Sequence, residues 1–93
     1  MKIEYKQRIA KMNETFKANE NIVINDSLPL ARWAYFGAEA SIDNLISDME
    51  NKDSEAIKYI VSEKRRRLTN LKEVLIKRFP DDEYLQEDLG KWN

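Results

Sequence analysis

The fold is decided by residues 27–49, whose sequence is SLPLARWAYFGAEASIDNLISDM. Drawn as a helix at about 100° per residue, this stretch carries apolar side chains on two opposite sides. One side holds Ala31, Ala34, Tyr35, Ala38, Ile42, Leu45, Ile46 and Met49. The other side holds Trp33, Phe36, Gly37 and Ala40. A helix that is apolar on two sides is typical of the buried middle element of a bundle.

Capping and turn residues mark the ends of this helix. Asp26 or Ser27 is a good N-cap, and Pro29 is tolerated in the first turn because its missing N–H would be unpaired there. We expect the helix to end at about Met49. The polar residues 51–53 then form a short connection, which predicts that the next helix is an antiparallel neighbour.

Two further long helices are predicted from apolar periodicity. The first covers about residues 2–18, and the third runs from Ser54 to about Phe79, where Pro80 ends it. Between the first two helices, Ile22, Val23 and Ile24 form a β-branched run that we interpret as an extended segment lying over the core.

A short fourth helix is predicted over residues 82–89, with Gly90 as its C-terminal stop. The predicted fold class is therefore all-α, a small antiparallel helical bundle of three long helices plus a short C-terminal helix. One domain over residues 1–93 is expected from the length. The second and third helices would extend beyond the first and leave apolar surface, which makes a homodimer a candidate assembly.

The residue types that the chain lacks exclude several kinds of chemistry. It has no Cys and no His, so it lacks a thiolate nucleophile, a disulfide framework and the commonest general base. Its two glycines, Gly37 and Gly90, stand far apart, so no glycine-rich phosphate loop is present. We therefore expect a protein that is not an enzyme and has no catalytic residues, metal site or cofactor.

Neither a membrane span nor a targeting segment is indicated by the sequence. No stretch approaches the roughly 20 apolar residues that a spanning helix needs. Residues 1–6 lack the apolar core of a signal peptide. The expected location is cytoplasmic, without membrane contact.

Positive charge is concentrated in the predicted third helix. Residues 57–78 carry eight basic and two acidic side chains, whereas the segments on both sides are acidic. Antiparallel pairing would place Asp43 level with residues 62–64 and Glu39 level with residues 66–68. We therefore favour a charge seam between the second and third helices, which would set their register.

The run of basic residues from Lys64 to Arg67 supports an alternative, a phosphate-binding surface for nucleic acid. The contact residues would be Arg65, Arg66, Arg67, Lys72 and Lys77. Four consecutive helical residues point in four directions, so the run cannot form one stripe. The formal net charge of -1 also gives weak long-range attraction to phosphate, so nucleic acid is the second choice.

Lys64 falls inside the apolar stripe of the third helix, between Val61 and Leu68. Its side chain must either reach out to water or meet a carboxylate such as Asp43. We favour this structural role. The alternative is that Lys64 binds a small anionic ligand.

Three aromatic side chains, Trp33, Phe36 and Trp92, raise the prospect of a protein interface. Exposed tryptophans are frequent hot spots of such interfaces. A domain of this size needs its large aromatics for the core, however, which favours burial of these side chains under the first helix or the C-terminal segment.

These features together predict a small non-enzymatic protein-interaction module, such as an inhibitor, an adaptor or an immunity-type regulator. Charge-segregated helix faces would then select the partner and speed its association. The candidate contact residues are Trp33, Phe36, Arg66, Lys77 and Trp92.

Overall fold

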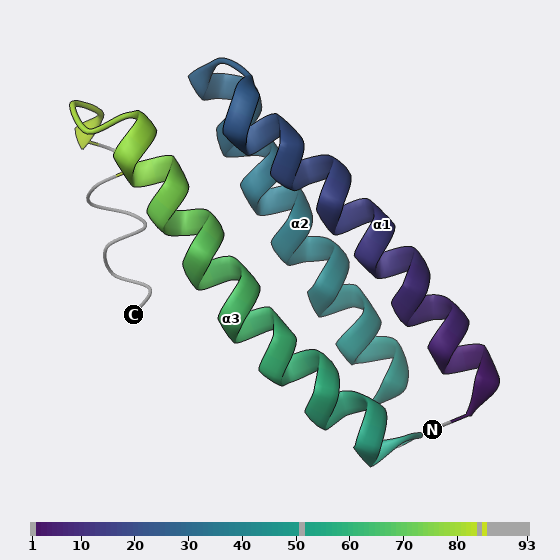
Figure 1. Ribbon diagram of the computed structural model, residues 1–93. Helices are drawn as coiled ribbons and strands as arrows, with labels where there is room; N and C mark the ends of the chain where they lie inside the picture. Colours follow the sequence, from purple (N-terminus) through teal and green to yellow (C-terminus); the bar gives the residue numbers. More distant parts are fainter. Residues whose placement is uncertain (1, 51, 84, 86–93) are drawn as a thin grey trace.

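Three long helices pack side by side in the part of the chain that the structure describes (Figure 1). The computed structural model describes residues 2–50, 52–83 and 85. Helix α1 covers Ile3–Asn25, α2 covers Leu28–Met49 and α3 covers Ser54–Arg78. No strand occurs among these described residues. The all-α prediction is confirmed for this part of the chain, and each helix runs antiparallel to the next (Figure 1).

The predicted boundaries of α2 and α3 are confirmed. Ser27 is the N-cap of α2, Pro29 lies in its first turn, and the helix ends at Met49. Asp53 is the N-cap of α3, and its Oδ1 accepts a hydrogen bond of 3.1 Å from the N–H of Ala56. This hydrogen bond is the main reason that the pKa of Asp53 is lowered. Local capping chemistry therefore sets where these helices begin.

The interpretation of residues 22–24 as an extended segment is wrong, because α1 continues through them to Asn25. Val23 is fully buried and continues the stripe that begins with Tyr5, so leaving the helix would lift it from the core. Intrinsic β-propensity amounts to less than about 1 kcal/mol per residue, so burial decides the outcome. The predicted helix end at about residue 18 is wrong for the same reason.

The longer α1 also removes the overhang that made a homodimer attractive. The three helices have 23, 22 and 25 residues, so α1 is as long as α2. The first helix therefore accompanies α2 over its whole length (Figure 1). The homodimer stays a prediction, but the overhang of α2 and α3 beyond α1 no longer supports it.

The core is built from one broad side of each helix. On α2 this is the side that carries Tyr35 and Ile42, both nearly inaccessible to solvent. On the second apolar side of α2, Phe36 is partly buried against the core, but Trp33 is 81% exposed. The expected burial of Trp33 is therefore wrong, because no described helix covers this position of α2.

After α3 the chain turns at Phe79 and Pro80, as predicted. The carboxylate of Asp82 accepts a 2.8 Å hydrogen bond from the N–H of Leu85, and the Leu85 side chain is buried in the core. Most of the predicted helix over residues 82–89, together with Trp92, lies outside the described residues. The three described helices are therefore the only part of the bundle prediction that the structure supports.

None of the described helices combines the length and the apolar character needed to cross a bilayer. The cytoplasmic location stays a prediction.

Candidate functional site

A hollow of about 320 Å³ lies between α2 and α3. Helix α3 contributes three cations to its lining, Lys64, Arg65 and Lys72. Helix α2 contributes Tyr35 and Glu39. The cations converge because residues three, four, seven and eight apart lie on one side of a helix. Lys64, the residue that the sequence singled out as a possible anion binder, thus lines this hollow together with Arg65 and Lys72.

The predicted pairing of Lys64 with Asp43 is confirmed. Lys64 Nζ lies 2.6 Å from Asp43 Oδ1, and both side chains keep access to solvent. Such a solvent-accessible pair contributes at most about 1 kcal/mol to stability, so its main effect is on register. It supports the predicted charge seam at this one position, whereas Arg66 and Arg67, which were expected level with Glu39, pair with Glu63 on their own helix.

Glu39 stands in an unfavourable place for a carboxylate. Burial raises its pKa first, the neighbouring Asp43 carboxylate raises it further, and Lys64 offsets part of this. Burial, with a smaller contribution from Glu39, also raises the pKa of Tyr35 to about 12. The hollow therefore holds a phenol that stays protonated at neutral pH and a carboxylate that is destabilised in its charged form.

Replacing Glu39 by Gln is expected to stabilise the protein at neutral pH. The folded protein holds the Glu39 proton more tightly than the unfolded chain, so stability falls as pH rises through the window above the ordinary value of 4.5. After allowance for solvent screening, we expect the Tm of Glu39→Gln to rise by roughly 1–3 °C at pH 7. Below the ordinary pKa, at about pH 3.5, the variant and the parent should have the same Tm, because Glu39 is then protonated in both the folded and the unfolded state.

Thermal unfolding followed by circular dichroism at the two pH values checks this prediction. Glu73→Gln makes the same chemical change at an exposed position of α3 and is the control. An equal gain for Glu39→Gln at both pH values would contradict the assignment to ionisation.

Two of the α3 arginines bind α1. Arg67 Nη1 donates a 2.6 Å hydrogen bond to Asn13 Oδ1, and its guanidinium lies 5.4 Å from the ring centroid of Phe16. Arg78 Nη1 donates a 2.6 Å hydrogen bond to the carbonyl of Val23. These side chains cover apolar surface and hold α1 to α3. Their role here is structural.

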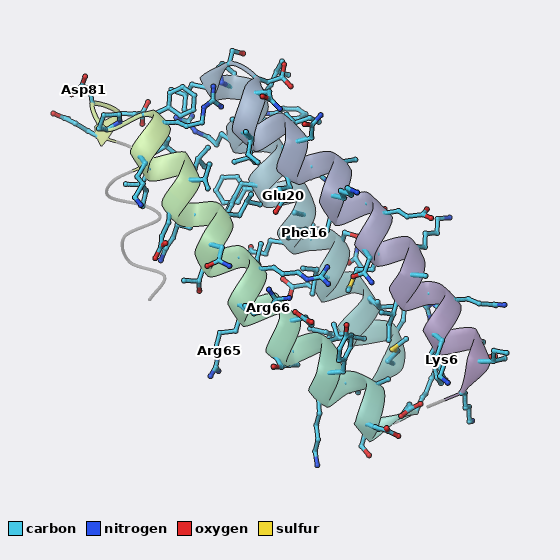
Figure 2. All side chains as sticks on the ribbon, in the orientation of Figure 1. Lys6, Phe16, Glu20, Arg65, Arg66 and Asp81 are labelled. Carbon is cyan, nitrogen blue, oxygen red and sulfur yellow. The ribbon has the colours of Figure 1, made fainter. Side chains whose placement is uncertain are left out.

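The other predicted nucleic-acid contacts have different surroundings. Arg66 is paired with Glu63 on its own helix, and this hydrogen bond is the main reason that the pKa of Glu63 is lowered. Lys72 is buried. Arg65 and Lys77 are exposed, and within the described residues neither is within ion-pair distance of a carboxylate. Figure 2 shows Arg65 pointing away from the bundle.

A second surface surrounds Trp33 near the start of α2. Leu30, one turn earlier on the same side, is 55% exposed. Sequence reasoning missed Leu30, although its spacing of three residues from Trp33 was available as a signal. Phe36 is not part of this surface, because its ring packs edge-to-face on Tyr35 with the centroids 5.4 Å apart.

The hollow and the Trp33 surface lie on different sides of α2. Trp33 and Glu39 are six residues apart, which corresponds to about 240° around a helix. A ligand in the hollow and a partner on Trp33 would therefore meet different faces of the molecule. Of the predicted partner contacts, the structure exposes Trp33, Arg66 and Lys77, with Trp33 on α2 and the two cations on α3.

Among the described residues, no three acidic side chains come together in a way that could hold a metal ion. The arrangement offers charge, apolar surface and hydrogen-bonding groups, all of which serve binding.

No protein family, curated protein or solved structure matches this chain.

Proposed function

We propose that the protein is a non-enzymatic protein-interaction module that binds its partner through Trp33. The observation that carries the proposal is the 81% exposure of this side chain, whereas most of the other aromatic side chains that the structure describes pack inward. Tryptophan is enriched among the residues that dominate interface energies, because burying it removes a large apolar area from water. Leu30 beside it enlarges the apolar patch.

The surroundings of Trp33 support an interface rather than a simple exposed side chain. It stands on a regular helix, so its backbone loses little freedom when a partner binds. Arg32 next to it is ion-paired with Asp82, at 3.5 Å, which ties this part of α2 to the turn after α3. A rigid aromatic anchor of this kind suits an inhibitor, an adaptor or an immunity-type regulator.

The test starts with a tagged full-length chain and host lysate, with and without nuclease. The captured partner is then purified, and its affinity is measured for the parent and for Trp33→Ala. We expect the variant to bind at least tenfold more weakly, since hot-spot truncations cost about 2 kcal/mol or more. Its Tm should stay close to that of the parent, because the side chain is exposed.

Tyr59→Ala is the matched control, because Tyr59 is an exposed aromatic on α3. It should bind the partner as the parent does. Equal binding by Trp33→Ala and the parent would overturn the proposal. Sedimentation of the purified chain separates self-association from a different partner, and a concentration-dependent dimer that Trp33→Ala abolishes would identify a second copy as that partner.

Nucleic acid binding by α3 remains the alternative function. It is less favoured because Arg67 is engaged with α1 and Lys72 is buried, which leaves Arg65, Arg66 and Lys77 as exposed contacts. Loss of every captured protein on nuclease treatment, with a steep fall in affinity as salt rises, would move the assignment to nucleic acid.

A further inference from the structure

The hollow between α2 and α3 is one part of a longer furrow. A second hollow along α3 shares Val61 and Arg65 with it. A third, next to the connection between α2 and α3, shares Ile57 and Lys58 with the second. We call this continuous surface the α3 furrow and define it by Ile57, Lys58, Val61, Arg65, Leu68 and Lys72.

The α3 furrow combines apolar surface with an excess of positive charge. Its three hollows are lined by six basic side chains and by three carboxylates, those of Glu39, Glu50 and Asp53. Val61 is 40% exposed, and Ile57 beside it is partly buried against the core. Lys58 and Arg65 are exposed on its edge, and in the described part of the chain neither is ion-paired. Cations without carboxylate partners can pair with an incoming ligand without first breaking an ion pair.

The length of the furrow favours a polypeptide over a small molecule. From Ile57 to Thr69, the last exposed residue of α3 that lines the furrow, the helix rises roughly 18 Å, at about 1.5 Å per residue. This is about three helical turns, enough to seat an amphipathic helix with anchors three and four residues apart. Apolar side chains of such a helix can be buried against Val61. A charged nucleic-acid backbone would gain nothing from that apolar contact.

We propose that the α3 furrow docks an acidic amphipathic segment of a partner protein. Apolar side chains of that segment lie on Val61 and Ile57, and its carboxylates pair with Lys58 and Arg65. This proposal does not rest on the Trp33 interface, since Trp33 lies on another face. A chain that holds two segments on two faces acts as an adaptor.

The probe is a fluorescein-labelled acidic helical peptide of about 18 residues, with leucines spaced three and four apart. Its binding to the full-length protein is measured by fluorescence anisotropy at about 50 mM salt, where surface charges act strongly. A scrambled peptide of the same composition should bind at least tenfold more weakly, because its leucines no longer share one side.

Two variants and one matched control locate the site. Arg65→Glu should weaken peptide binding about tenfold or more, because it replaces an attraction by a repulsion. Val61→Ala should weaken it roughly threefold to fivefold through lost apolar contact. Lys77→Glu makes the same charge change on α3 outside the furrow, and it should change affinity by less than about twofold.

The outcomes separate this proposal from its competitors. Absence of peptide binding, or equal losses for Lys77→Glu and Arg65→Glu, would overturn it. So would tighter binding of a single-stranded oligonucleotide that depends on Arg65 and ignores Val61, because the furrow would then be a phosphate surface. Trp33→Ala should leave peptide affinity unchanged, so failure here and failure of the Trp33 interface are distinguishable.

Discussion

Ile60→Ala is expected to lower the free energy of unfolding by about 3 kcal/mol. Ile60 is fully buried in the core, and truncating such a side chain removes buried apolar area and leaves a cavity. Domains of this size have only about 5–15 kcal/mol of stability in total. The Tm should therefore fall by roughly 10–20 °C.

The neighbouring Val61→Ala is the matched control for this prediction. Val61 is the next residue on the same helix, but it is 40% exposed, so its truncation leaves no closed cavity. Urea denaturation followed by circular dichroism measures both variants. The expected order is a large loss for Ile60→Ala and a loss below about 1 kcal/mol for Val61→Ala. Similar losses for the two would mean that α3 packs by a different face.

Asn21→Pro is expected to cost about 3 kcal/mol, although Asn21 is exposed and the residues around it resemble a helix end. In α1 this position is helical, so proline removes the N–H that would bond to the carbonyl of Lys17 and its ring clashes with that carbonyl. Disrupting the helix there would also displace Val23, which is buried and accepts the hydrogen bond from Arg78.

Asn21→Ala isolates the backbone effect. It removes only the side-chain hydrogen bond with Asn25, at 2.8 Å, and alanine favours the helix. We expect its stability to stay within about 0.5 kcal/mol of the parent. If Asn21→Pro were as stable as Asn21→Ala, the chain would leave the helix before residue 21, as the sequence pattern had suggested.

The helix boundaries show which signals can be read locally. Asp53 before a run of apolar periodicity and Pro80 after it were sufficient to place α3 to within one residue. Capping and proline act over a single turn, so neighbouring residues contain all the information needed. The C-terminal part of α1 was different, because the local β-branched signal at residues 22–24 competed with burial of Val23 against other helices.

The charged contacts also divide into those that the sequence predicts and those that only the tertiary structure shows. The Lys64–Asp43 pair could be predicted, because a short connection fixes which residues of two antiparallel helices face each other. The position of Arg67 over Phe16 could not, because it depends on the side from which α1 approaches α3. Helical spacing alone separates Lys58 and Arg65, which are seven residues apart, from Arg67. Only the packed structure shows that α1 covers the flank that carries Arg67.

The sequence by itself determined the all-helical class, the extents of α2 and α3, and the register between them, since periodicity, capping and loop length act over short distances. The tertiary structure decided that α1 continues to Asn25, that Trp33 stays exposed, and that Val61 and Arg65 line one furrow. Each of these depends on which side of a helix its neighbour covers. An amphipathic pattern with two apolar sides does not specify that choice, which is made by the packing of the whole core.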